Sequence, residues 1–218
     1  MTTRIAVAIE ETPQRTFATA IDWPGWSRSG KTVAGALEAL DSYTGRYRPV
    51  AALAGAAFPD GDLELEVFET ASGGAGTEFG VPSRVTDADR RPTSAADADY
   101  LARLVEAAWA RLAEIARDSP EELRKGPRGG GRDKTKILGH VIAADAAYAR
   151  EIGLKLKEPA IDDRAAIEAL RAALLEVLRQ PTDGSPLAGR KWTARYAAHR
   201  IAWHALDHAW EMEDRREP

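Results

Sequence analysis

The spacing of apolar residues changes once along this chain, and that change constrains the fold more than any other feature of the sequence. Near the N-terminus, apolar residues alternate along RIAVAIEE and RTFATAIDW, which predicts two strands paired as a hairpin. Beyond about residue 95, apolar residues recur every three or four positions, which is typical of amphipathic helices. The sequence therefore predicts an α+β protein whose strands come first and whose helices come last.

The strand-rich part also contains one predicted helix and one further strand. The segment TVAGALEALDSYTGRY spaces its apolar residues by three and four positions, and Thr32 is a candidate N-cap for this helix. After a turn at Asp60 and Gly61, LELEVFE alternates apolar with acidic residues, as expected of a strand that is exposed to water on one side. The predicted order of elements in this part is β-β-α-β.

A segment rich in glycine, proline and small polar residues follows over residues 71–92. We place the domain boundary within it, so that residues 1–85 form a small α+β domain and residues 86–218 an all-α domain. Four amphipathic helices of about 20 residues each predict that the second domain is a four-helix bundle. The expected positions are Ala95–Ala116 with a Ser94/Asp97 capping box, a second helix capped by Asp133, a third capped by Asp162, and a fourth from about Arg190 to Glu213.

Charge and composition exclude several classes of function. Lys and Arg total 30 against 34 Asp and Glu, so a net charge of −4 gives no electrostatic basis for binding nucleic acid. No apolar run approaches the roughly 18 residues of a membrane helix, and Glu10 and Glu11 interrupt the apolar start as no signal peptide would, so we expect a cytoplasmic protein. Because the chain has 0 cysteines, nucleophiles and metal ligands must come from other residue types.

The segment GWSRSGKT, Gly25–Thr32, matches the phosphate-binding pattern G-x-x-x-x-G-K-[ST]. Such a loop follows a buried parallel strand in a sheet that also supplies an acidic partner for magnesium. The sequence predicts too few strands for that sheet, and no apolar run ends in Asp. We therefore interpret the segment as two glycine turns and a helix N-cap.

The four histidines contain the most informative pattern for chemistry. His204 and His208 lie one turn apart on a single face of the last helix, Glu211 shares that face, and His140 lies beside the apolar stripe of the second helix. Three imidazoles from two helices can hold a metal ion with coordination positions left open, as in catalytic zinc sites. Neutral ligands also leave the ion its full charge as a Lewis acid. His199 points elsewhere and is expected at the surface or between helices. The alternative, that these are hydrogen-bonded core histidines, stays open.

The second and fourth predicted helices, KILGHVIAADAAYAREI and ARYAAHRIAWHALDHAWEMEDR, resemble the DinB-like superfamily of metal-binding four-helix bundles. The resemblance covers about Ser94 to Arg215 and implies a Zn, Ni, Fe or Mn site. His140 takes the position of the ligand in the second helix, and His204 and His208 take the H-x-x-x-H of the fourth. Some relatives are enzymes that use low-molecular-weight thiols such as mycothiol or bacillithiol, others are hydrolases, and many have no established activity.

The N-terminal segment FATAIDWPGWSRSGKTVAGALEAL is similar to the HicB-like fold, over about residues 4–70. Trp26 stands where that family usually has a small residue, and no DNA-binding tail follows, so the antitoxin function of the family is not carried over. The resemblance implies a small accessory domain that shapes a pocket or mediates dimer contacts.

Two functions remain as hypotheses. The first is a metal-dependent enzyme of the thiol-transferase, isomerase or hydrolase type, acting on a small molecule, with a low-molecular-weight thiol as cosubstrate for thiol transfer. Glu211 would be a fourth ligand or, like Asp207, a carboxylate that orients an imidazole. The second is a non-catalytic module whose HicB-like part binds a small protein partner and whose metal is structural or vestigial. We expect no nucleic acid or membrane as partner, and we regard a homodimer as a guess from the six tryptophans.

Overall fold

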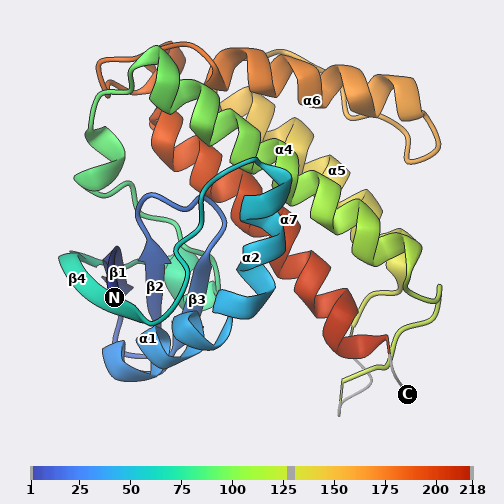
Figure 1. Cartoon of the computed structure of the whole chain (residues 1–218). Coiled ribbons are helices and arrows are strands. Elements are labelled where there is room, and N and C mark those ends of the chain that lie inside the picture. The colour runs from blue at the N-terminus through green and yellow to red at the C-terminus, as the bar shows by residue number, and fades with distance from the viewer. Residues whose placement is uncertain (1, 127–130, 217–218) are drawn as a thin grey trace.

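The computed structural model describes residues 2–126 and 131–216 and has a mixed α+β architecture, with a four-stranded sheet followed by helices (Figure 1). The sheet consists of β1 (Thr3–Glu11), β2 (Thr16–Ala20), β3 (Ser27–Gly30) and β4 (Leu63–Ser72), in the order β3-β2-β1-β4. β1 and β2 form the predicted antiparallel hairpin, and β4 runs parallel to β1 at the edge of the sheet.

The predicted order β-β-α-β is wrong in two places. β3 was not expected, because SRSG has no alternation of apolar residues; it forms by antiparallel pairing with β2 across the turn that follows Trp23. The single predicted helix is two helices, α1 (Val33–Ser42) and α2 (Thr44–Leu53). The Thr32 cap is confirmed, since its hydroxyl oxygen accepts a hydrogen bond from Gly35 N at 3.1 Å. The segment Gly25–Thr32 is thus a turn, a strand and a cap.

Two short elements lie in the glycine-rich and proline-rich segment: α3 (Ala75–Phe79) and the 3₁₀ turn η1 (Ala88–Arg90). Four long helices follow: α4 (Ala95–Arg117), α5 (Lys134–Glu151), α6 (Arg164–Leu178) and α7 (Ala194–Arg215). The capping box of Ser94 and Asp97 at the start of α4 is confirmed.

Two predicted helix starts and one predicted side-chain cap need correction. Asp163 rather than Asp162 caps α6, because its carboxylate accepts a hydrogen bond from Ala166 N at 3.0 Å. α7 begins at Ala194 rather than Arg190, with Thr193 as the N-cap. Asp133 occupies the N-cap position of α5, but its carboxylate binds Lys125 and a backbone amide of the preceding loop instead of capping the helix.

Helix α7 contacts α4, α5, α6 and η1, and it also faces the sheet. The buried apolar cluster is continuous from the strands through α1 and α2 into the long helices, so the division at residues 85 and 86 stays a prediction. The turn between β2 and β3 comes close to α7 at Gly25, whose φ of +91° suits glycine. A Cβ added there would lie 2.7 Å from Leu206 Cδ1 and 3.1 Å from the Ala202 backbone.

Across the described residues, no helix combines the length and the apolar character that crossing a membrane requires.

Candidate metal centre

The three predicted ligands lie together in the structure. His140 comes from α5, and His204 and His208 come from successive turns of α7. One potential ligand atom from each of the three residues can be chosen so that all lie within 4.8 Å of one another. Helix periodicity explains the pair on α7, and the packing of α5 against α7 brings His140 to it. Together the three residues form a group that could hold a metal ion.

The spacing of two of these nitrogens fits a shared ion. His204 Nε2 and His140 Nε2 lie 3.3 Å apart. Two imidazole nitrogens bound to one tetrahedral zinc ion at 2.0–2.1 Å would be separated by about 3.3–3.4 Å. His204 and His208 are buried, with exposed fractions of 7% and 8%, whereas His140 is half-buried.

Glu211 contacts His208 directly. His208 Nδ1 donates a hydrogen bond to Glu211 Oε2 at 2.8 Å, which leaves the lone pair of this imidazole on Nε2. Arg215 Nη1 lies 2.7 Å from the other carboxylate oxygen of Glu211. These contacts, the hydrogen bond from His208 first among them, lower the pKa of Glu211 and keep it ionised. This arrangement is typical of a carboxylate that orients a ligating imidazole.

The electrostatics at His204 and His140 favour neutral imidazoles. Burial lowers the pKa of His204 to about 2, with further contributions from the nearby His208, Arg200 and His140. Burial is also the main cause of the lowered pKa of His140. Neutral imidazole is the form that binds metal ions.

Two other candidate residues lie apart from the group. His199 faces the sheet rather than the surface, and its Nε2 donates a hydrogen bond to Ile21 O at 2.9 Å. Asp207 was expected to orient an imidazole, but its carboxylate instead accepts a hydrogen bond from Arg28 Nη1 of β3 at 3.0 Å. This correction follows from the β3 strand that the sequence did not reveal.

Two residues beside the histidines were missed. Arg200 precedes His204 by one turn on α7, and Tyr148 lies on α5 with its ring centroid 5.7 Å from that of His204. The guanidinium of Arg200 lies over the Tyr148 ring at 5.2 Å. The spacing R-x-x-x-H-x-x-x-H was a readable signal for Arg200, whereas nothing in the sequence pointed to Tyr148.

Comparisons with protein-family models, with curated proteins and with solved structures each give no match to this chain.

Proposed function

We propose that this protein is a metal-dependent enzyme that acts on a small molecule, with a divalent ion held by His140, His204 and His208. The observation that carries the proposal is the convergence of three imidazoles from two helices, with two Nε2 atoms 3.3 Å apart. Three protein ligands leave at least one coordination position for water or substrate, which distinguishes catalytic from structural zinc sites.

The surrounding residues favour a metal site that keeps an open coordination position over one in which protein ligands fill every position. Glu211 accepts the hydrogen bond from His208 Nδ1 and so fixes the tautomer that has its free lone pair on Nε2. Its carboxylate therefore lies on the side of the ring opposite to the nitrogen that would bind the metal ion. His140 is half-buried, so a substrate can approach from its side. Imidazole ligands accept Zn, Ni, Fe and Mn, so the ligand set does not select one of them.

The class of reaction follows from the chemistry that such an ion supplies. A bound divalent cation lowers the pKa of a coordinated water or thiol and so generates hydroxide or thiolate near neutral pH. Since the chain has 0 cysteines, a thiol nucleophile must come from a cosubstrate. The DinB-like resemblance favours thiol transfer or isomerisation with a low-molecular-weight thiol, and hydrolysis is the alternative reaction at the same centre.

The test is an activity screen on metal-loaded protein. Wild type and His208→Ala are each incubated with mycothiol or bacillithiol and a panel of small electrophiles, and separately with ester and amide substrates. The proposal expects turnover by the wild type that chelation and the substitution both abolish. Wild type that binds no divalent ion under any loading condition would overturn it.

A partner-binding role is a second candidate, favoured by the exposed edge of the sheet. β4 is an edge strand, and its Val67 and Phe68 are 43% and 64% exposed. An unpaired strand edge with apolar side chains is a common docking surface for another chain. Capture of a small protein by wild type but not by Phe68→Ser would support this role.

A further inference from the structure

A second candidate site is an open groove of about 580 Å³ beside the residues that lead into α7. Three parts of the chain that are far apart in sequence line it: the last two residues of β4, residues 83–90, and residues 186–192. Its volume falls within the range of about 300–1,000 Å³ that is typical of small-molecule sites. None of the described residues that line it belongs to the three-histidine group.

The charged side chains that line this groove are all cationic. Arg84 and Arg90 come from one wall, Arg190 and Lys191 come from the other, and no described Asp or Glu lines the groove. All four cationic residues are exposed. Among the described residues, no carboxylate lies within 4.0 Å of any of these four charged groups. Four such cations around one groove create a local positive potential that attracts an anionic ligand, although the whole chain has a net charge of −4.

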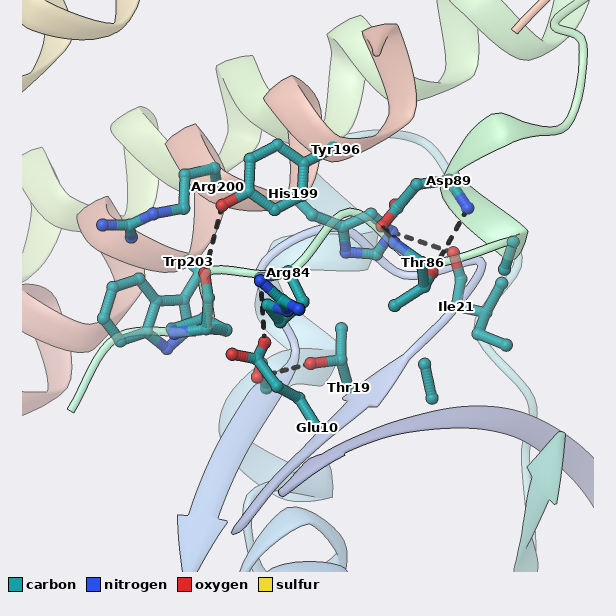
Figure 2. A pocket seen from close by; sticks show the side chains of 14 residues that line it. Glu10, Thr19, Ile21, Arg84, Thr86, Asp89, Tyr196, His199, Arg200 and Trp203 are labelled. Carbon is teal, nitrogen blue, oxygen red and sulfur yellow. Dashed lines mark hydrogen bonds between the residues drawn. The ribbon is translucent and has the colours of Figure 1, made fainter. Parts of the chain in front are cut away.

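The wall that carries Arg84 and Arg90 is held in place by hydrogen bonds. The backbone N–H of Arg84 donates to the buried carboxylate of Glu10 at 3.1 Å (Figure 2). Arg90 Nη1 donates to the backbone carbonyls of Val85 and Thr86 at 2.9 Å and 3.0 Å. Glu10 is thus engaged by the backbone of this wall and forms no ion pair with the Arg84 guanidinium.

The opposite wall is held by a backbone hydrogen bond and by aromatic packing. Leu187 N donates to Trp192 O at 2.7 Å, which closes the loop that carries the other two cations. The ring of Trp192 packs against Tyr148 and Tyr196, with centroids 5.2 Å and 5.1 Å apart. Because both walls are held before a ligand arrives, less conformational entropy is lost on binding.

We propose that this groove binds a small molecule that carries a diphosphate group. Two cations on each wall match two phosphoryl groups, and Arg and Lys are the side chains that bind phosphate oxygens. Val85, Pro186 and Trp192 give the groove an apolar part that can contact the organic portion of such a ligand. The bounded volume and the net charge of −4 favour a small molecule over a nucleic acid. The site requires no metal ion, so its test is separate from that of the proposed enzyme.

The test is isothermal titration calorimetry of inorganic pyrophosphate into the whole protein, at low and constant ionic strength, after a chelator has removed metal ions and has itself been removed. We expect saturable binding of about one equivalent. Orthophosphate and sulfate offer a single tetrahedral group each and should bind at least about tenfold more weakly. No saturable binding, or equal binding of pyrophosphate and sulfate, would overturn the proposal.

Variants locate the effect in the groove. Arg84→Met and Arg190→Met each remove one cation from one wall and should each weaken pyrophosphate binding at least about fivefold. Lys191→Met takes the place of Arg190→Met if the latter does not fold. Arg164→Met removes the same charge from a side chain that is 91% exposed at the start of α6, outside the groove, and should leave binding unchanged. His204→Ala should also leave it unchanged, because it alters only the proposed metal centre.

The outcomes of this comparison separate the alternatives. Binding that the groove variants do not weaken would place the anion elsewhere on the surface. Loss of binding on chelation or in His204→Ala would place it on a metal ion instead. A single-stranded oligonucleotide that binds more tightly than pyrophosphate under the same conditions would identify the groove as a nucleic-acid surface. Each of these three results contradicts the proposal.

Discussion

His140 on α5 and His204 on α7 direct their Nε2 atoms toward each other across 3.3 Å, although 64 residues separate them along the chain. With the pKa of both rings lowered by burial, the pair is neutral. Two neutral imidazole nitrogens at this distance either share one proton or bind one ion between them. Metal binding therefore distinguishes a ligand group from an ordinary pair of core histidines.

We expect wild type to bind about one equivalent of Zn²⁺ and His204→Ala to bind it at least about 100-fold more weakly, because one of three ligands is lost. Competition with a chromophoric chelator measures the affinity. His199→Ala is the matched control, since it removes an imidazole of the same helix that lies outside the group. Equal affinity of wild type and His204→Ala would show that these histidines are not ligands.

Two substitutions distinguish the two possible roles of Glu211, which are to orient His208 and to bind the metal ion itself. If its carboxylate orients His208, Glu211→Gln keeps an acceptor for Nδ1 and should lower the affinity for zinc less than Glu211→Ala, which should cost about 10–100-fold. If Glu211 is itself a ligand, both substitutions should weaken binding by similar factors. The same competition assay measures both variants.

Asp145 should make stability depend on pH. Burial raises its pKa to about 6 despite the ion pair with Arg171 at 3.1 Å. The folded state therefore binds this proton more tightly than the unfolded state, so the stabilisation is complete below about pH 4 and is lost as the pH rises through 6. Relative to Asp145→Asn, the free energy of unfolding of wild type should fall by on the order of 3 kcal/mol between pH 4 and pH 7. Urea unfolding at several pH values measures this difference, and a difference that is constant with pH would contradict the raised pKa.

Gly25 should be intolerant of a side chain. Gly25→Ala places a methyl group against Leu206 and Ala202 at a positive φ, and should destabilise the protein by about 2–4 kcal/mol. Gly45→Ala is the opposite case, since no atom lies within 4 Å of its added Cβ and the residue is helical. That variant should be neutral or more stable by up to about 1 kcal/mol. Thermal unfolding compares the two, and equal effects would contradict the close approach of the turn to α7.

The parts of the fold that follow from local patterns were predictable. Alternation identified β1, β2 and β4, and helix periodicity with capping residues identified the four long helices. β3 was not predictable, because SRSG has no pattern of its own and becomes a strand only through pairing with β2. The division of the predicted helix at Tyr43 and the late start of α7 also depend on backbone geometry that periodicity does not encode.

The same distinction applies to the site. Spacing alone placed His204, His208 and Glu211 on one face of α7, but the approach of His140 depends on how α5 packs. Asp207 lies beside His208 in sequence, and its partner Arg28 is 179 residues away, so no local pattern could have shown that pairing.

The contact between Arg28 and Asp207 also has a mechanical consequence. Arg28 of β3 binds α7 at Asp207, the residue immediately before His208. The N-terminal sheet therefore restrains rotation of the helix that carries two of the three histidines. Arg28→Met removes this ion pair and should make the orientation of the His208 ring less fixed, although no histidine is changed. The sheet thus fixes the position of α7 next to the three histidines.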